Sequence, residues 1–511
     1  MKKILLTTIE QITNAKYNIE LWLLENEEFD CYTKQKSLFV LSKNNLNFTV
    51  EFNKLIFAYW TLETSESWKV ISYQIKQNQL VVEVLIPFQK KTTTYLLQKK
   101  TNTHQVIDFN KKASRANYLK TLEKLIKQHF YSYIIEKSSL SQSIEYGYKI
   151  AIARLLIKYE NSLIAAVGIS ESENTYFLAS LLGQGLKWLN TLKSRFTPIP
   201  IKKLIFFAPP KAIKLLAERL TLIKILETEV EIFEVDELAS KISFVQAFDQ
   251  GDLGLLANKR KLNYCKIIKD KTVNQQIQWI KSLAPNLIEL KPNLQNTKIS
   301  FSINGLEFAN VRLQKNTSIK FGLSLEKKTL NSENQEDLVR LVREITYYRQ
   351  AASPNKQHKY YQTRSEAWLE SIICHNLNYL DSNLDSNCFY RQVPIIKDSS
   401  RFIDILAVTK DGQLVIIELK ASEDKESLFQ CLDYWLRVEW YRLRKNLSNY
   451  FPTIKLKDRA ALIYLVTPKL RSHPDLSLLG NFIDKKVPLY RIEIKDNWRQ
   501  ELKIESHIKL T

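Results

Sequence analysis

The sequence predicts an α/β protein, and three observations carry that prediction. Helical and strand-like apolar patterns alternate through most of the chain. Charged residues interrupt two otherwise apolar strand-like runs near residue 410. The first hundred residues follow a strand-and-turn rhythm. We expect four regions: a mostly β domain at 1–110, an α/β domain at 111–240, a mixed connecting region with strands and a helix at 241–350, and a mixed sheet flanked by helices at 351–511.

Short apolar runs separated by Asn-, Lys- and Thr-rich breaks mark the first region. They read SLFVLS, KLIFAYW, WKVISYQI and QLVVEVLIPF, which is typical of successive strands. Aromatic residues on strands most often pack in a core. We therefore assign these aromatic side chains to packing rather than to stacking on nucleic-acid bases.

The charge balance of the chain indicates either a polyanionic partner or composition drift, since Lys, Asn, Ile and Tyr are plentiful and Gly numbers only 10, as expected of an AT-rich genome. The 511 residues include 75 Lys and Arg against 54 Asp and Glu, a formal net charge of +21. A cationic protein attracts nucleic acid because each neutralised phosphate releases condensed counterions. No apolar run reaches the roughly 18 residues that a membrane-spanning helix needs. We expect a cytoplasmic protein that makes no membrane contact.

Cysteine and histidine spacing argues against a structural zinc site. The cysteines form no CxxC pair, and the six histidines follow no metal-ligand rhythm. An odd number of cysteines in a chain of this size fits reduced thiols better than a disulfide framework. The five cysteines are Cys31, Cys265, Cys374, Cys388 and Cys431.

The middle of the chain, between about Arg115 and Glu237, changes to an alternating pattern. It runs helix, strand, strand, helix, strand, helix, strand, with NSLIAAVGI and KKLIFFAP among the strands. Further strands are predicted at ISFSINGLEFANVRL and SIKFGL. Ser332, with Gln335 three positions later, predicts a capping box at the start of a helix. The polar run ASPNKQHKYYQ then predicts a linker.

The same order of elements recurs after residue 362, which suggests a duplicated core. Setting Leu163 against Val415 aligns NSLIAAVGISES with GQLVIIELKASED, and the following helix, strand, helix and strand fall in step. The alternative is coincidence, because any two α/β units share such a rhythm. With a duplication, the first copy lacks two charged side chains of the second and serves as a scaffold or binding surface. The correspondences are Glu418 with Ala166 and Lys420 with Gly168.

Three charged residues lie in strands whose other residues are apolar. Asp404 interrupts RFIDILAV, and Glu418 and Lys420 interrupt QLVIIELK. Strands of this kind are buried on both faces. A lone buried carboxylate costs several kcal/mol in practice, so the three charges are expected to meet, usually around a cation. The alternative is a salt-bridged hairpin in which Lys420 only neutralises an acid.

The length of the turn between these strands decides whether the charges share a face. Side chains alternate along a strand, so Glu418 and Lys420 point the same way. A two-residue turn at Asp411 and Gly412 would put Asp404 on the opposite face. A three-residue turn that also includes Lys410 puts Asp404 directly opposite Glu418. We predict the three-residue turn, because Gly412 then occupies the position that requires a left-handed backbone.

Two carboxylates facing each other across a strand pair form an oxygen-rich site. Such a site suits Mg²⁺, with Mn²⁺ as a substitute, and the carbonyl of Leu419 is available as a further ligand. The metal can activate a water molecule. Lys420, beside it, can orient that water or stabilise charge on a phosphate.

The spacing of these three residues resembles the PD-(D/E)XK nuclease superfamily, although Ile403 stands where the name has proline. The segment FIDILAVTKDGQLVIIELK is similar to the corresponding segment in the NucS and RecB-like branches of that superfamily. The resemblance covers the last third of the chain, from about Tyr361 to Thr511. It implies a restriction-endonuclease-like fold there, with a possible degenerate copy in the middle of the chain. It also implies catalytic roles for Asp404, Glu418 and Lys420.

The RecB-like members add a Gln-x-x-x-Tyr motif on the following helix, and this chain has Gln430 and Tyr434 at that spacing. The resemblance therefore implies that both residues position substrate or water. Residues four apart share a helical face, and Arg437 continues the stripe, where it could contact a phosphate. The alternative is an ordinary polar edge on an amphipathic helix.

Superfamily members commonly add a metal-binding glutamate from the preceding helix. In SEAWLES, both Glu366 and Glu370 are candidates because they lie on adjacent turns of one helical face. Glu366 has a structural alternative, since Thr363 three positions earlier would form a capping box with it. Both glutamates therefore stay open as metal ligands.

Together these features predict a Mg²⁺-dependent deoxyribonuclease, a phosphodiester hydrolase of bacterial defence or DNA repair. DNA is expected as the substrate ahead of RNA, by analogy alone. One alternative is a catalytically silent nuclease-fold scaffold that binds nucleic acid or a partner protein. Another is a nuclease subunit that is active only in a complex. A homodimer or a larger complex is compatible with these readings, and the chain has no GxxxxGK(S/T) phosphate loop of its own.

Overall fold

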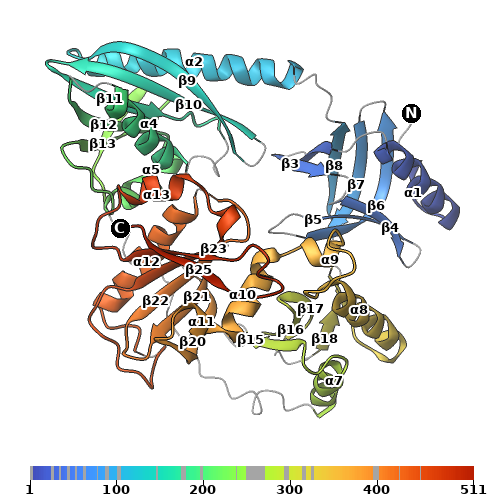
Figure 1. The fold of residues 1–511 in the computed structure, drawn as a ribbon. Coiled ribbons are helices and arrows are strands. Elements are labelled where there is room, and N and C mark those ends of the chain that lie inside the picture. Colours follow the sequence, from blue (N-terminus) through green and yellow to red (C-terminus); the bar gives the residue numbers. More distant parts are fainter. Residues whose placement is uncertain are drawn as a thin grey trace. The chain divides into compact units, whose positions relative to one another are not determined.

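The computed structural model has a mixed α/β fold and divides into two compact units (Figure 1). Unit 1 comprises residues 1–103, 258–376 and 497–502, and unit 2 comprises residues 104–257, 377–496 and 503–511. The structure describes residues 4–24, 28–33, 36–42, 46–51, 54–60, 65–76, 79–86, 91–99, 105–145, 148–173, 180–195, 199–237, 239–248, 271–292, 298–312, 318–323, 327–394, 402–424, 426–448 and 450–511.

Unit 1 contains an antiparallel sheet built from the first hundred residues, in the order β3-β2-β8-β7-β6-β5-β4, with β1 paired to β6. Its strands are β1 (Ile4–Leu5), β2 (Glu28–Thr33), β3 (Lys36–Ser42), β4 (Leu46–Glu51), β5 (Lys54–Trp60), β6 (Ser65–Lys76), β7 (Gln79–Ile86) and β8 (Lys91–Lys99). The strand rhythm is confirmed. The sequence reading missed one helix, α1 (Ile9–Leu24), which packs against β4, β5 and β6. Aromatic residues such as Phe57 and Trp68 lie in the core, as expected.

A second sheet of unit 1 has the order β15-β16-β17-β18-β19. Its strands are β15 (Ile288–Pro292), β16 (Lys298–Ile303), β17 (Leu306–Arg312), β18 (Ser318–Phe321) and β19 (Lys328–Thr329). The nearby helices of the chain are α7 (Lys271–Ser282), α8 (Gln335–Tyr348), α9 (Lys359–Gln362) and α10 (Ser365–His375). The strands expected in this region are confirmed.

Two local predictions in unit 1 are wrong. The capping box lies one residue earlier than expected, with Asn331 and Asn334 exchanging hydrogen bonds ahead of α8. The predicted linker is ordered instead: it contains α9, and the buried guanidinium of Arg349 donates to the carbonyl of Tyr360 at 2.7 Å. A buried cation that binds backbone carbonyls holds this segment against the core.

Unit 2 contains two sheets. The first sheet has the order β14-β13-β12-β11-β10-β9. Its strands are β9 (Ile134–Glu145), β10 (Tyr148–Tyr159), β11 (Ser162–Gly168), β12 (Ile201–Ala208), β13 (Glu229–Asp236) and β14 (Lys241–Val245). Its helices are α2 (Gln105–His129), α4 (Leu181–Arg195) and α5 (Pro210–Leu220). The second sheet has the order β20-β21-β22-β23-β24-β25. Its strands are β20 (Leu384–Pro394), β21 (Phe402–Thr409), β22 (Leu414–Leu419), β23 (Leu462–Pro468), β24 (Leu489–Ile494) and β25 (Ile504–Lys509). Its helices are α11 (Leu377–Leu380), α12 (Ser427–Leu443) and α13 (Asp475–Gly480).

The two sheets of unit 2 have the same topology. In each, the first three strands form antiparallel pairs, the third, fourth and fifth pair in parallel, and the last pairs antiparallel. In each, one helix follows the third strand and another follows the fourth. A duplicated core predicts that the two sheets share one topology. We call the β9–β14 sheet with α4 and α5 copy 1, and the β20–β25 sheet with α12 and α13 copy 2.

Neither a membrane-spanning helix nor a disulfide bond is expected from the sequence. In the ranges that the structure describes, no helix is long and apolar enough to cross a bilayer. Cys31 and Cys431 are buried thiols. Cys265 lies outside the described residues.

Candidate active site

The β21–β22 hairpin brings the predicted acids face to face. Its ladder pairs Ile405 with Ile417 and continues in step to the turn. Because 404 + 418 equals 405 + 417, the same register places Asp404 opposite Glu418. The amide of Thr409 donates to the carbonyl of Gln413 at 2.8 Å, which leaves a three-residue turn of 410–412. The predicted register is confirmed.

The turn uses the glycine that the sequence indicated. Gly412 has a φ of 93°, in the left-handed region, and a Cβ atom there would lie 2.2 Å from the carbonyl oxygen of Lys455. A side chain at this position is therefore excluded by backbone conformation and by space.

Hydrogen bonds from β20 and β22 hold the carboxylate of Asp404. The amide of Leu419 donates to Oδ2 at 2.9 Å, and Nε2 of Gln392 donates to Oδ1 at 3.1 Å. Gln392 lies opposite Asp404 in the β20–β21 register and has a φ of 50°. The sequence reading missed Gln392, because the register of β20 against β21 was needed to find it.

Glu418 and Lys420 lie together at the end of β22. Lys420 Nζ is 3.1 Å from Glu418 Oε1 and 3.4 Å from Asp424 Oδ2. The side chains of Glu418 and Lys420 are only 4% and 11% exposed. Asp424 was also missed, because in the polar run SEDKE it looked like a solvated loop residue. Lys420 thus bridges two carboxylates, those of Glu418 and Asp424.

Helix α12 presents Tyr434 to these charges. Burial raises the pKa of Tyr434, and the charges of Glu418 and Asp404 raise it further. Its hydroxyl therefore stays protonated and can act as a donor. Cys431 lies one turn earlier; burial raises the pKa of its thiol, and the charge of Glu418 adds to this. Gln430 is half-buried and precedes Tyr434 by one turn.

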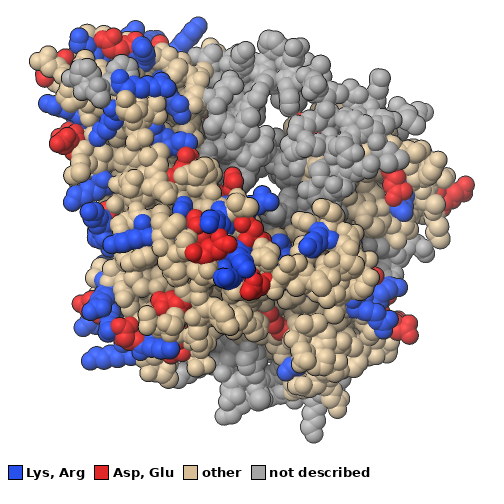
Figure 2. All heavy atoms as spheres, in the orientation of Figure 1, with Lys and Arg blue, Asp and Glu red and all other residues tan. Residues whose placement is uncertain are grey.

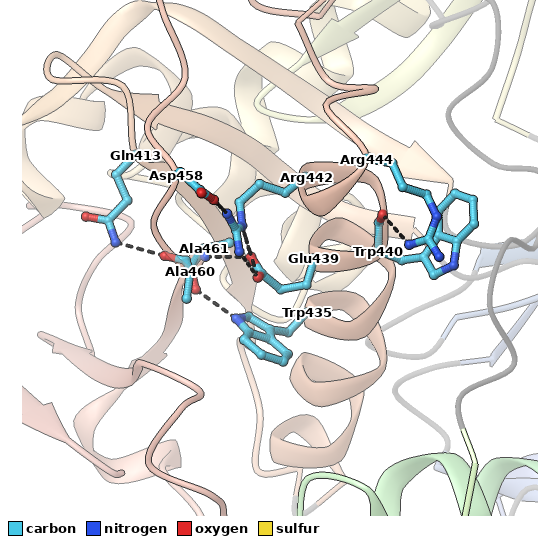
Figure 3. A network of polar contacts seen from close by, with 9 residues as sticks. All are labelled: Gln413, Trp435, Glu439, Trp440, Arg442, Arg444, Asp458, Ala460 and Ala461. Carbon is cyan, nitrogen blue, oxygen red and sulfur yellow. Dashed lines mark hydrogen bonds and ion pairs between the residues drawn. The ribbon is translucent and has the colours of Figure 1, made fainter.

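Polar contacts fix the C-terminal half of α12 to the chain before β23 (Figure 3). Trp435 Nε1 donates to the carbonyl of Ala461 at 2.9 Å, and the amide of Ala461 donates to Glu439 Oε1 at 2.8 Å. Arg442 pairs with Glu439 and with Asp458. The helix that carries Tyr434 is therefore held rigidly on copy 2.

Copy 1 holds the other side of α12 through buried charges. Arg219 of α5 donates to both oxygens of Asp433 at 2.9 Å, and its Nη1 lies 3.4 Å from Glu426 Oε2. Burial lowers the pKa of Arg219, but the charges of Asp433 and Glu426 outweigh it and raise the pKa. Arg437 of α12 pairs with Glu218. Its predicted phosphate contact is wrong, because Arg437 is buried in this pair.

The two candidate helix glutamates lie on α10, which belongs to unit 1, whereas Asp404 and Glu418 belong to unit 2. The capping box expected for Glu366 is wrong. Arg364 is the N-cap residue, with a φ of 50° and no side-chain hydrogen bond to the helix. Glu370 is buried. The metal contact of either glutamate stays a prediction.

The described residues contain no cluster of three or more His, Cys, Asp and Glu side chains arranged to hold a metal ion. Asp404 and Glu418 lie opposite each other in the hairpin, and their role as metal ligands stays a prediction. All their donor atoms are oxygens, the donors that Mg²⁺ prefers. The contribution of the Leu419 carbonyl stays a prediction.

Comparison with known proteins adds little to this geometry. No protein-family model and no curated protein matches the chain. Two solved structures show a limited likeness: a complex of EndoMS with double-stranded DNA, and a repair endonuclease from Pyrococcus abyssi. Each is 11% identical and covers 46% of this chain, and the match spans 96% and 99% of the two known chains, with TM-scores of 0.16 and 0.15. Likeness at this level carries no argument about fold or function.

Replacing Gly412 by alanine should destabilise the hairpin, because the new Cβ meets backbone and the left-handed conformation becomes strained. We expect a loss of about 1–3 kcal/mol in the free energy of unfolding, measured by urea denaturation. Asp411→Ala, in the same turn, is the control and should change stability much less, since its ion pair with Lys457 is exposed. Equal effects of the two substitutions would contradict the explanation.

Replacing Arg219 by alanine should destabilise unit 2 by about 3–5 kcal/mol, because it leaves two buried carboxylates without their guanidinium. The matched control is Lys187→Ala, whose ion pair with Asp475 also joins copy 1 to copy 2 but is partly exposed. That change should cost about 1 kcal/mol or less. Urea denaturation of both variants tests the difference, and a mild effect of Arg219→Ala would show that water reaches the carboxylates.

Proposed function

We propose that the protein is a Mg²⁺-dependent nuclease that hydrolyses phosphodiester bonds of DNA, with a restriction-endonuclease-like fold in copy 2. The observation that supports this most is the register of β21 and β22. It sets Asp404 opposite Glu418, with Lys420 on the same face as Glu418 and in contact with it. Charges brought together amid apolar sequence cost stability, and such clusters are common at functional sites.

Asp404 and Glu418 would hold the metal ion. When bound, Mg²⁺ would supply charge to polarise a phosphate oxygen and lower the pKa of a water molecule. The hydrogen bonds from Leu419 and Gln392 keep Asp404 oriented toward the opposite strand. Acceptors fixed in advance need not reorganise when a cation arrives.

Two donors would act on the phosphate or on the attacking water. Lys420 brings a positive charge to the edge of the site, where it would stabilise negative charge that develops on the phosphate. Tyr434 offers a phenolic hydroxyl, which would donate a hydrogen bond to a phosphate oxygen or to the water. Gln430, one turn away, is the further candidate for orienting substrate.

A basic surface supports nucleic acid as the substrate. The net charge is +21, and Lys and Arg side chains gather along the left side of the face shown in Figure 2, over the part of the chain that forms unit 2. Surface cations add affinity for phosphates without selecting a sequence. DNA rather than RNA remains the proposed class.

Cleavage assays with site variants test this function. Purified protein should cut plasmid, linear duplex or single-stranded DNA with Mg²⁺ or Mn²⁺, and EDTA should abolish cutting. Asp404→Asn and Lys420→Met should each reduce the rate at least about 100-fold, since each removes a charge needed in the transition state. Asp411→Asn, at the turn of the same hairpin, should leave the rate unchanged. DNA binding without any cleavage by the wild type would indicate a silent scaffold instead.

Replacing Tyr434 by phenylalanine should lower kcat about tenfold or more with little change in KM, because it removes one donor but keeps the ring that packs in the core. The matched control is Tyr464→Phe, which removes a hydroxyl bonded to Asp381 elsewhere in copy 2. Steady-state kinetics on one oligonucleotide substrate measure both. A Tyr434→Phe enzyme with wild-type kcat would assign the residue to packing alone.

A further inference from the structure

Copy 1 and copy 2 meet around an approximate two-fold axis. Ile223 and Ile483 form an isolated antiparallel bridge, and each lies three residues after the end of its own helix, α5 or α13. The amide of Lys224 donates to the carbonyl of Phe482 at 2.9 Å, and the amide of Asp484 donates to the carbonyl of Leu222 at 2.8 Å. Equivalent positions thus contact each other reciprocally, as in a symmetric dimer interface.

The helices around this bridge repeat the symmetry. Helix α12 of copy 2 packs against α5 of copy 1, and α4 of copy 1 packs against α13 of copy 2. Gly183 and Phe429 are each the third residue of their helices, α4 and α12, and the Phe429 ring lies 3.2 Å from where a Cβ of Gly183 would be. One chain therefore builds both halves of a dimer-like core.

Charged residues of copy 1 pair with oppositely charged residues of copy 2 across this interface. Copy 2 paired with a second copy 2 would not have these complementary charges. Lys187 and Asp433 occupy equivalent positions, six residues after the first residue of α4 and α12 (187 − 181 and 433 − 427). Lys187 pairs with Asp475 of α13, and Asp433 pairs with Arg219 of α5. Two copies of copy 2 joined in the same way would set Asp433 against the helix that carries Asp475. Like charges disfavour that pairing, so the interface selects copy 1.

The position in copy 1 that corresponds to the active site is apolar and filled. Leu155 lies opposite Ala166 in the β10–β11 register, as Asp404 lies opposite Glu418 in copy 2. A Cβ at Gly168, which corresponds to Lys420, would meet the Tyr118 hydroxyl at 2.7 Å and Leu122 at 2.8 Å. The residues that correspond to Asp404, Glu418 and Lys420 are therefore Leu155, Ala166 and Gly168, which carry no charge.

We propose that each chain is a single-strand nicking enzyme: its dimer-like core contains one active site, and the face that would recruit a second active copy is occupied within the chain. This inference rests on the proposed nuclease function. In each event water adds to phosphorus, one P–O ester bond breaks, and the leaving oxygen takes up a proton. One strand of a duplex is cut in one binding event.

Supercoiled plasmid distinguishes nicking from double-strand cleavage. With Mg²⁺ and the full-length protein in excess, open circles should accumulate first, and linear DNA should appear only after a lag, from independent nicks. The initial rate should rise in proportion to protein concentration. Linear product without a lag, or a rate that rises with the square of the concentration, would overturn the inference while supporting a nuclease. No cleavage with any metal would overturn the nuclease function and the nicking inference with it.

Mixing active and inactive chains provides a second measurement. Asp404→Asn protein is added in equal amount to the wild type, with DNA in large excess so that the two do not compete. If each chain acts alone, the nicking rate per wild-type chain should stay unchanged. A twofold fall would mean that active sites of two chains work together, which contradicts the inference. Lys187→Ala protein is the control. It shows whether loss of the partly exposed ion pair between copies changes the nicking rate per chain.

Discussion

The register between β21 and β22 is the constraint on which the proposed chemistry depends. Side chains alternate along a strand, so a slip of one residue would carry Asp404 to the opposite face from Glu418. Gly412 prevents that slip, because its left-handed backbone closes a three-residue turn and the carbonyl of Lys455 fills the space beside it. A residue about eight positions from Asp404 therefore decides whether two carboxylates can share one cation.

A fixed register would not suffice without a fixed helix. Tyr434 reaches the charges from α12, and α12 is held from two sides. On copy 2, Trp435 and Glu439 bind the segment that leads into β23 (Figure 3). On copy 1, Arg219 binds Asp433, the residue directly before Tyr434. Side chains whose supports are buried and hydrogen-bonded lose little conformational freedom on binding substrate, which is how a scaffold without catalytic groups can still contribute to rate.

The sequence predicted what local periodicity and turn chemistry determine. The hairpin register followed from strand alternation and the conformational need of Gly412, and the apolar runs of both copies became strands and helices in the expected order. Contacts made across strands or between copies could not be read this way. In the sequence, Gln392 and Asp424 are ordinary polar residues. Only the folded structure shows that they contact Asp404 and Lys420, respectively. The spacing of Arg437 on its helix predicted a phosphate contact. In the structure Arg437 is buried in an ion pair with Glu218, which is distant in sequence.

The charges buried between the copies make the stability of copy 2 depend on copy 1. Asp433 and Glu426 are almost inaccessible to water, and their compensation comes from Arg219 of the other copy. Copy 2 alone would expose the apolar faces of α12 and α13 and leave those carboxylates without a guanidinium, so it would lose stability at the helix that carries Tyr434. The facing pair Leu155 and Ala166 of copy 1 is apolar and needs no such compensation. Arg219 of copy 1 differs, because the buried carboxylates of Asp433 and Glu426 in copy 2 depend on its guanidinium.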